Sequence, residues 1–261
     1  MTEKRALVTG AGGRLGRAMA VYLAERGFDV VVHYASSEEG ARETLRLIEA
    51  HGRTGVTLQA DLLNEDETQA LIDRASDALG GPLTVLVNNA SIFEEDDLES
   101  STRESWDRHF ESNLRAPYVL TQHFAKQVPE AALDGRGEPV ARGLIVNMID
   151  QRVRKLTPKF STYTLAKMGL WALTKTSAQA LAPKVRVNAI GPGPTLQGER
   201  QSAEDFADQR SVTVLKRGSN PEDIVAALGY FLAAPAITGQ LLCVDGGQHL
   251  GWETPDVLTR E

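Results

Sequence analysis

The chain has 261 residues, of which 42% are hydrophobic and 24% charged, and this is enough to bury a substantial core within one large domain. Its net charge is -7 and its basic residues are scattered, which argues against nucleic acid or an anionic membrane as a partner. No apolar run approaches the roughly 18 residues of a membrane span, and a strand pattern starts within a few residues of Met1. We therefore expect a soluble, cytoplasmic protein that binds a small molecule. The one cysteine and the five histidines lack metal-ligand spacing, so no metal site is expected.

Short β-branched segments alternate with amphipathic segments of helical length along the chain. Strands are expected at residues 5–10, 29–34, 55–62, 83–90, 143–150, 184–193 and 239–247. Helices are expected at residues 15–27, 38–52, 66–80 and about 103–127, then around Tyr163 and in a polar segment after residue 193. Nearly continuous apolar strands are typical of a parallel sheet with helices on both faces. The pattern predicts a single Rossmann-type, doubly wound seven-stranded α/β domain over residues 1–261, with residues 129–143 as a surface loop.

The first strand leads into a glycine-rich turn, TGAGGRLG, at residues 9–16. Glycines between a strand and a helix let the backbone approach a pyrophosphate, whose charge the helix N-terminus stabilises. A strict G-x-G-x-x-G does not fit, because Leu15 stands where the third glycine would be. The pattern T-G-x-x-x-G-x-G fits at Gly10 and Gly16, with Arg14 in place of its middle glycine. The alternative is a plain strand-to-helix connection.

The end of the second strand reads HYASSEE and distinguishes between nicotinamide cofactors. It lacks an acidic residue where NADH enzymes bind the ribose 2′-hydroxyl. The polar side chains there can instead donate hydrogen bonds to a 2′-phosphate: His33, Tyr34, Ser36 and Ser37. Arg14 can supply a cationic partner, so NADPH is favoured over NADH. Glu38 and Glu39 fit the start of a helix, where the helix dipole stabilises negative charge.

Tyr163 and Lys167 are four residues apart, so they share one face of the helix that follows the fifth strand. This helix starts at the carboxyl end of the sheet, where doubly wound folds bind ligands. An ammonium group close to a phenol favours its ionised form, so we expect the pKa of Tyr163 to be lowered from its ordinary value of about 10. The pair suits acid catalysis coupled to hydride transfer.

Together these motifs resemble the short-chain dehydrogenase/reductase family over the length of the chain. The resemblance implies that Asp61 and Leu62 contact the adenine. It implies that the NNA segment, Asn88, Asn89 and Ala90, borders the adenine ribose. It implies that Lys167 also holds the nicotinamide ribose and that Asn113 anchors a water that relays protons to Lys167. The remaining cofactor contacts lie in the first turn and after the sixth strand: Gly10, Arg14, Leu15, Gly16, Pro192, Gly193 and Thr195.

Asp150 lies thirteen residues before Tyr163, at a position where most of this family has a serine. A serine hydroxyl donates to a substrate carbonyl as negative charge develops there, whereas an ionised carboxylate repels that charge. Asp150 suits a substrate that presents N–H donors and accepts hydride at a C=N bond, as pterins do. The chain is similar to the pteridine reductases, which also have arginine in the glycine loop, HY after the second strand, and NNAS followed by phenylalanine. The alternative is that Asp150 caps a nearby helix or pairs with Arg152 or Arg154.

The resemblance implies that Phe93 stacks the pterin against the nicotinamide and that Ser91 contacts polar groups of the cofactor or the pterin. The alternative for Phe93 is an ordinary loop hydrophobe. The catalytic residues implied in this way are Asp150, Tyr163, Lys167 and Asn113. The predicted reaction is the reduction of a 7,8-dihydropterin to a tetrahydropterin by NADPH. The alternatives are an NADPH-dependent carbonyl or 3-oxoacyl reductase, and an NADPH-sensing binding protein without catalysis.

Two regions are left for substrate specificity and assembly. Residues 194–218 form the expected substrate loop, in which pterin side-chain specificity cannot be assigned from sequence. Residues 251–261 form a C-terminal tail beyond the last strand, and we hypothesise that Trp252 reaches an adjoining subunit. The family resemblance implies a homotetramer.

Overall fold

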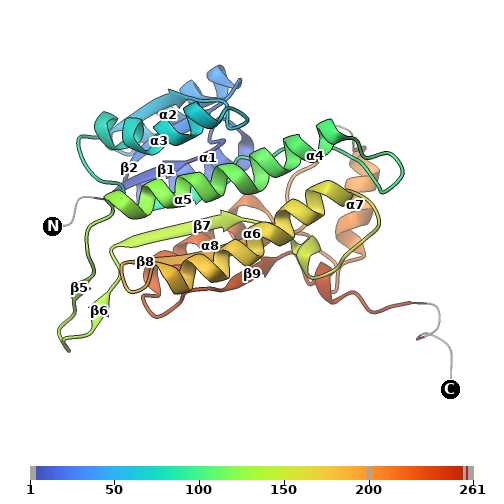
Figure 1. Cartoon of the computed structure of the whole chain (residues 1–261). Coiled ribbons are helices and arrows are strands. Elements are labelled where there is room, and N and C mark those ends of the chain that lie inside the picture. The colour runs from blue at the N-terminus through green and yellow to red at the C-terminus, as the bar shows by residue number, and fades with distance from the viewer. Residues whose placement is uncertain (1–3, 199–200, 255–256, 258–261) are drawn as a thin grey trace.

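A parallel sheet runs through the centre of the molecule, with helices on both of its faces (Figure 1). The computed structural model describes residues 4–198, 201–254 and 257. Within these residues the sheet has seven strands in the order β3-β2-β1-β4-β7-β8-β9, and every neighbouring pair is parallel. The strands are β1 (Arg5–Val8), β2 (Asp29–Tyr34), β3 (Gly55–Gln59), β4 (Val85–Asn88), β7 (Gly143–Met148), β8 (Val185–Pro192) and β9 (Leu241–Val244). The predicted doubly wound, seven-stranded fold is confirmed.

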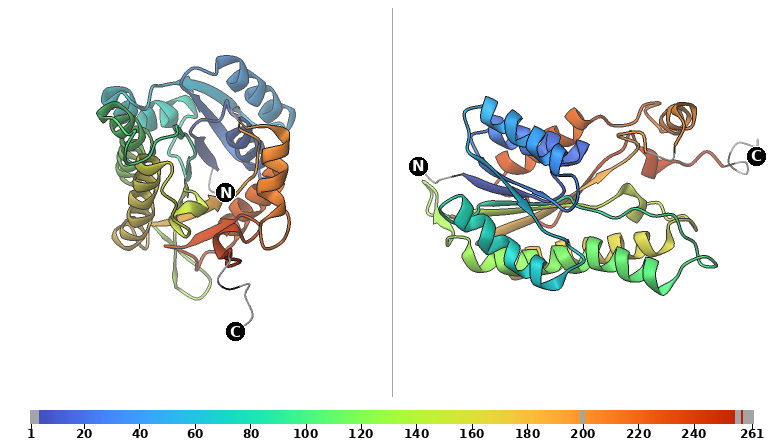
Figure 2. Two further views of the ribbon diagram at one scale, coloured as in Figure 1. Left: turned by 90° about the vertical axis from the view of Figure 1, so that its right-hand side faces the viewer. Right: turned by 90° about the horizontal axis from the view of Figure 1, so that it is seen from above.

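Eight α-helices occur in the described part of the chain, and they form two layers on opposite sides of the sheet (Figure 2). Those packed on one face are α1 (Arg14–Glu25), α2 (Glu38–Ala50) and α8 (Pro221–Ala233). Those packed on the other are α3 (Glu65–Ala78), α5 (Ala116–Gln127) and α6 (Ser161–Ala180). The remaining two are α4 (Arg103–Phe110), which contacts α6, and α7 (Ala203–Ser211).

Side chains of the sheet alternate between two hydrophobic clusters. Ala6 and Val8 of β1 pack under α1 and α8, whereas Leu7 between them packs against the opposite helix layer. Because both faces are covered, each strand must be apolar throughout, which is the pattern that the sequence has. Burying one large side chain such as Phe124 contributes roughly 2–3 kcal/mol, so two such clusters supply most of the driving force for folding.

Three segments differ from the sequence prediction. The surface loop 129–143 contains a two-stranded antiparallel hairpin, β5 (Ala132–Leu133) and β6 (Pro139–Val140), which projects from the body in Figure 1. The long helix expected at 103–127 is divided by a π-helical segment, Glu111–Arg115. The region between β8 and β9 contains two helices, α7 and α8, instead of one polar helical segment. No helix among the described residues has the length and apolar character required to cross a membrane.

Candidate active site

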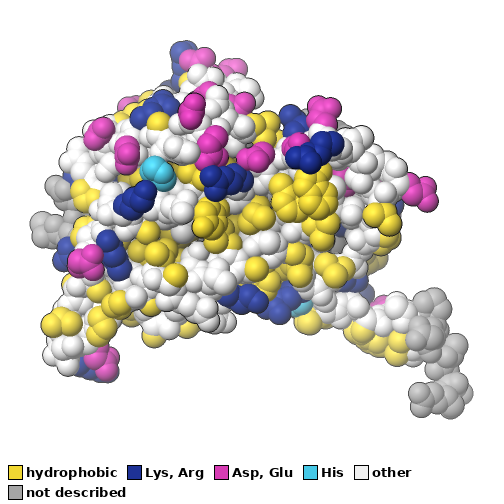
Figure 3. Space-filling view, viewed as in Figure 1, with side chains coloured by type: hydrophobic (Ala, Val, Ile, Leu, Met, Phe, Trp, Pro, Cys, Tyr) yellow, Lys and Arg dark blue, Asp and Glu magenta, His cyan; other side chains and the backbone are white. Residues whose placement is uncertain are grey.

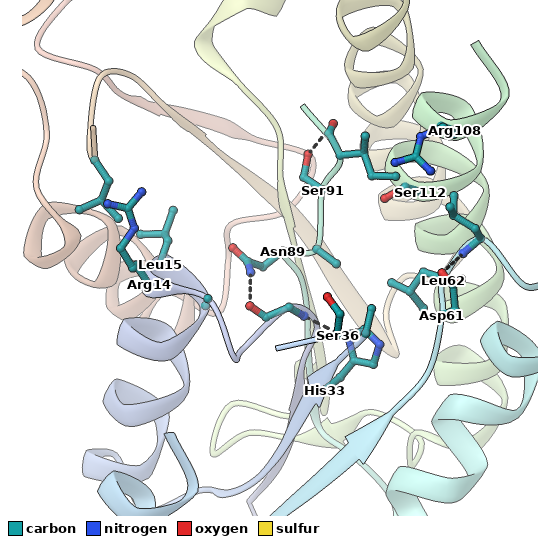
Figure 4. Close-up of a pocket in the computed structure, with 18 residues that line it drawn as sticks. Arg14, Leu15, His33, Ser36, Asp61, Leu62, Asn89, Ser91, Arg108 and Ser112 are labelled. Atoms are coloured by element: carbon teal, nitrogen blue, oxygen red, sulfur yellow. Dashed lines mark hydrogen bonds between the residues drawn. The ribbon is translucent and has the colours of Figure 1, made fainter. Parts of the chain in front are cut away.

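A cavity of about 580 Å³ lies over the carboxyl ends of β1 to β4, where the strand order reverses between β1 and β4. In open α/β sheets this reversal separates the connections on either side and leaves room for a ligand. Figure 4 shows Arg14 and Leu15 on one side of the cavity and Asp61 and Leu62 on the other. The predicted residues that line it are Gly10, Arg14, Leu15, Gly16, His33, Ser36, Asp61, Leu62, Ala90 and Ser91. Ala35 and Asn89, from the predicted strand end and NNA segment, also line it. Lining residues that the sequence did not single out include Ile92, Arg108, Ser112 and Leu196.

The glycine turn is shaped to receive an anion. Gly10 has a φ of +64°, a left-handed conformation that side chains disfavour, and a Cβ on Gly16 would collide with the Gly10 carbonyl. Helix α1 then begins after Gly13 with no side-chain cap and no acidic residue in its first turn. Its first N–H groups and its positive dipole end are therefore open to a negatively charged group, and the turn fits a dinucleotide pyrophosphate.

Of the two adjacent asparagines, Asn89 lines the cavity and Asn88 does not. The Asn89 amide donates to the Thr9 carbonyl at 2.8 Å and so supports the glycine turn. The Asn88 amide is buried and donates to Asn147 on the neighbouring strand at 2.8 Å. Successive strand residues point to opposite faces, so the motif NNA brings only one of its two asparagine side chains to the cavity.

His33 cannot donate to a phosphate, and our expectation that it does is wrong. The Gly10 N–H donates to His33 Nδ1 at 3.1 Å, so the proton is on Nε2, which donates to the Ala60 carbonyl at 3.0 Å. Burial lowers the pKa of this imidazole to about 4, which keeps it neutral. His33 is instead the support that holds the glycine turn against the ends of β2 and β3.

Of the other residues predicted to bind the 2′-phosphate, some line the cavity and others do not. Ser36 lines the cavity, whereas Tyr34 packs against the hydrophobic core and Ser37 stands at the N-cap of α2. Arg14 donates to the Gln197 carbonyl at 2.8 Å and thereby ties the glycine turn to the predicted substrate loop. In Figure 4 Arg14 and Arg108 stand on opposite sides of the cavity.

The end of β8 carries the last predicted cofactor residues. Pro192 is the final residue of the strand, and the Gly193 N–H donates to the Val244 carbonyl at 3.0 Å. Thr195 is buried and shares a hydrogen bond of 2.5 Å with Ser219. None of these three lines the cavity, although the neighbouring Leu196 does. Residues 199 and 200 of the substrate loop lie outside the described residues.

Tyr163, Asp150 and Lys167 meet beside the end of β7. The Tyr163 hydroxyl donates to Asp150 Oδ2 at 3.0 Å, and the Arg152 backbone N–H donates to Asp150 Oδ1 at 2.8 Å. Asp150 therefore caps the short helix Gln151–Val153, as the alternative interpretation required, and also contacts the tyrosine. Lys167 Nζ donates to the Met148 carbonyl at 2.9 Å, and the lysine is 2% exposed. The predicted constellation is assembled by β7 and the first two turns of α6.

The electrostatics of this group differ from the expectation in one respect. The pKa of Tyr163 is raised well above its ordinary value, because burial and the Asp150 carboxylate both disfavour a phenolate. Our expectation that Lys167 lowers it is wrong, since the lysine ammonium interacts with the Met148 carbonyl and with Asp150. Burial raises the pKa of Asp150 and lowers that of Lys167 to about 8. Tyr163 is therefore a protonated phenol at neutral pH.

Asn113 lies in the π-helical segment and is fully buried. Its amide makes a pair of hydrogen bonds with Ile92: Oδ1 accepts from the backbone N–H at 3.0 Å and Nδ2 donates to the carbonyl at 2.9 Å. π-helical turns often occur at functional sites, and here the turn directs an amide to the segment after β4. Asn113 thus fixes the residues on either side of Ile92, namely Ser91 and Phe93.

Phe93 is 45% exposed and belongs to an aromatic group that the sequence did not predict. Its ring stacks on Phe160 with centroids 4.4 Å apart and meets Tyr163 edge-on at 4.8 Å. The Arg152 guanidinium lies 4.7 Å from the Phe160 centroid. A second cavity of about 640 Å³ is lined by Phe93, Glu95, Arg152, Phe160, Gly198, Gln201, Asp205 and Gln209. Its lining thus combines two aromatic rings with charged and amide side chains.

The C-terminal tail continues beyond β9. Trp252 is 56% exposed, whereas residues 255–256 and 258–261 lie outside the described residues. Its proposed contact with an adjoining subunit stays a prediction.

Comparison with known proteins adds four relationships. The family model described as enoyl-(acyl carrier protein) reductase matches residues 10–249. Curated relatives include 3beta-hydroxysteroid dehydrogenase 1 of Eggerthella lenta, 34% identical over 95% of this chain and 94% of that protein. Another is the 3-oxoacyl-[acyl-carrier-protein] reductase FabG of Staphylococcus aureus, 31% identical over 95% of this chain and 98% of that protein. Among solved structures, FolM alternative dihydrofolate reductase 1 of Brucella suis, in complex with NADP, has a TM-score of 0.89 and 44% identity, covering 97% of this chain and 98% of that one.

Proposed function

The chain belongs to the short-chain dehydrogenase/reductase family, and we propose that it reduces a 7,8-dihydropterin to a tetrahydropterin with NADPH. The observation that carries the proposal is the carboxylate of Asp150, which accepts a hydrogen bond from Tyr163 at 3.0 Å. A ketone reductase needs a donor at this place, and an ionised carboxylate is an acceptor. Pterin rings present N–H groups that such an acceptor can bind. The 44% identity to a dihydrofolate reductase named FolM supports the same substrate class.

The residues of the first cavity fit NADPH. Gly10, Gly16 and the open N-terminus of α1 suit the pyrophosphate, and Ser36 offers a hydroxyl where an acidic residue would repel a 2′-phosphate. The solved Brucella suis relative contains NADP, which supports this choice of cofactor. NADPH bound there would supply the hydride.

The substrate residues have separate roles. Asp150 orients the pterin through its N–H groups, and Phe93, which is 45% exposed, contributes aromatic surface to the pterin ring. Reduction of a 7,8-dihydropterin adds hydride to C6 and a proton to N5. Tyr163, which stays protonated because its pKa is raised, gives that proton where N5 lies within its reach, and otherwise water does. Lys167 keeps a positive charge beside the pair and serves the nicotinamide ribose.

A second candidate is an NADPH-dependent carbonyl or 3-oxoacyl reductase, which the 31% identity to FabG favours. The test is NADPH consumption with dihydrobiopterin, dihydromonapterin, dihydrofolate and a 3-oxoacyl thioester offered separately. Turnover of a dihydropterin supports the proposal, and turnover of the thioester alone replaces it with the second candidate. An NADPH sensor would bind NADPH but consume it with none of the four substrates, which separates a sensor from both candidates.

We also propose that the chain forms a homotetramer. Figure 3 shows hydrophobic side chains gathered over the face that α4, α5 and α6 form in Figure 1. Large hydrophobic side chains exposed on these helices are Trp106, Tyr118, Leu165 and Met168. Contiguous apolar area of this kind favours association between copies of the chain.

A further inference from the structure

Helix α6 carries Tyr163 and Lys167, and its N-cap residue makes no side-chain hydrogen bond to the first turn of the helix. Its N-cap residue Phe160 has no polar side chain and has a φ of 57°. This left-handed conformation is strained for a residue other than glycine and persists only where surrounding contacts impose it. The first N–H groups of a helix have no partner within the helix, so α6 requires acceptors from elsewhere.

Asp96 supplies these acceptors from the loop after β4. Its backbone carbonyl accepts from the N–H of Phe160 at 2.6 Å and from that of Ser161 at 3.3 Å. Its carboxylate accepts from the Thr162 N–H at 3.2 Å and from the Thr162 hydroxyl at 2.5 Å. Asp96 is 5% exposed, and its negative charge lies at the positive end of the helix dipole. One residue of the segment that carries Ser91 and Phe93 thus caps the catalytic helix.

His109 of α4 completes the network. The Glu94 N–H donates to His109 Nε2 at 3.1 Å, so the ring proton is on Nδ1. Nδ1 lies 2.6 Å from the Thr162 hydroxyl oxygen and donates to it, which leaves the hydroxyl proton for Asp96. This is a single consistent arrangement of hydrogen atoms. His109 is fully buried, and its ring meets Tyr163 edge-on at 5.9 Å.

We propose that Asp96, Thr162 and His109 are positioning residues that hold the catalytic helix in register with the segment after β4 that carries Ser91 and Phe93. The inference rests on the proposed function only for the identity of the substrate. The same link fixes Phe160, whose ring stacks on Phe93, and Tyr163, which stands one residue after Thr162. Loss of the link therefore misplaces the phenol relative to Asp150 and the stacking face relative to the phenol. Misplacement of reacting groups by about 1 Å lowers turnover by roughly a hundredfold.

The test compares Thr162→Val, which keeps the shape of the side chain without its hydroxyl, with Thr162→Ser, which keeps the hydroxyl. Asp96→Asn removes the charge of the cap in a third variant. We expect Thr162→Val to lower kcat at least tenfold while the Kd for NADPH stays within about twofold, because the glycine turn lies outside the network. Thr162→Ser is expected to stay within about threefold of the unchanged protein, and Asp96→Asn to lower kcat like Thr162→Val. A lowered melting temperature with unchanged kcat and KM would overturn the proposal.

Hydrogen exchange makes the test independent of the substrate. The unchanged protein is first assayed with a dihydropterin and with a 3-oxoacyl thioester, and the variants are then assayed with the substrate that it reduces faster. If the proposed substrate class is wrong, the assay of the unchanged protein shows it before any variant is compared. Amide exchange is then measured in the peptide that covers residues 158–164. We expect at least tenfold faster exchange in Thr162→Val and Asp96→Asn. Unchanged exchange in both variants would contradict the network even if neither substrate is reduced.

Discussion

The Tyr163 hydroxyl donates to Asp150 Oδ2 across 3.0 Å, although the two residues belong to different elements. Asp150 follows β7 and caps the short helix after it, whereas Tyr163 stands in the first turn of α6. Burial and the carboxylate raise the pKa of the phenol, which the neighbouring Lys167 does not lower. The pair therefore combines a hydrogen-bond acceptor with a protonated donor.

Replacing this acceptor should change substrate preference. We expect Asp150→Ser to lower kcat/KM for a dihydropterin by about a hundredfold or more, because the pterin N–H groups lose a carboxylate as their acceptor. The same change should raise activity toward a 3-oxoacyl thioester, since serine donates to a carbonyl. Asp150→Asn is the matched control, which keeps the size of the side chain but removes its charge. Equal dihydropterin turnover by all three proteins would mean that the carboxylate only caps the helix.

Ser36 offers a direct measurement of cofactor choice. In Ser36→Asp a carboxylate would face the 2′-phosphate, and we expect the Kd for NADPH to rise by about tenfold or more while that for NADH changes little. Ser36→Asn adds similar bulk without charge and should leave the ratio of the two Kd values within about threefold. Fluorescence titration of the unchanged protein and of both variants with each cofactor gives the six constants. An unchanged ratio in Ser36→Asp would place the 2′-phosphate elsewhere.

Lys167 should set the alkaline limit of activity. Burial lowers its pKa to about 8, so kcat/KM is expected to fall as pH rises through about 8 and the ammonium loses its proton. Lys167→Arg keeps its charge to much higher pH, so the residual kcat/KM of that variant should not fall near pH 8. Between pH 8 and the ordinary lysine value of 10.5 the unfolded chain binds more protons at this site, so Lys167 itself makes stability rise with pH there. A flat profile up to pH 10 in the unchanged enzyme would contradict this assignment.

His33 should make the protein sensitive to acid. Its pKa is lowered from 6.5 to about 4 by burial, so the unfolded chain binds more protons than the folded one between these values. Stability is therefore expected to fall by about 3 kcal/mol as pH drops from 7 to 4 through this residue alone. His33→Gln, whose amide oxygen can still accept from Gly10, should flatten that part of the profile. Denaturant unfolding at several pH values gives the free energies, and equal slopes in both proteins would exclude His33 as the cause.

Association through the face formed by α4, α5 and α6 can be tested by placing one charged side chain on it. We expect Leu165→Glu to reduce the molecular mass in solution, measured by light scattering, because a carboxylate would be buried without a partner. Leu133→Glu is the control, since this leucine is 73% exposed and belongs to the hairpin that projects from the body in Figure 1. A monomer in the unchanged protein would remove the tetramer proposal altogether.

The sequence by itself determined the order of strands and helices, since covered strands must be apolar and helices amphipathic. It also paired Tyr163 with Lys167, because residues four apart share one face of a helix. These predictions depend on local periodicity. The roles expected of the glycine turn and of Asp150 came from motifs and from resemblance to a family. The hairpin at residues 129–143 was missed because strands of two residues leave no periodic signal.

Tertiary structure alone decided how polar groups that are distant in sequence share their hydrogen bonds. His33 looked like a phosphate ligand until Gly10 and Ala60 were found to occupy both of its ring nitrogens. The pKa of Tyr163 depends on its burial and on its contact with Asp150, and neither can be predicted from the sequence. Asp96 lies 66 residues from Thr162 and caps its helix nevertheless. A buried polar group must find a partner wherever the fold brings one, so such pairings are a property of the packed molecule.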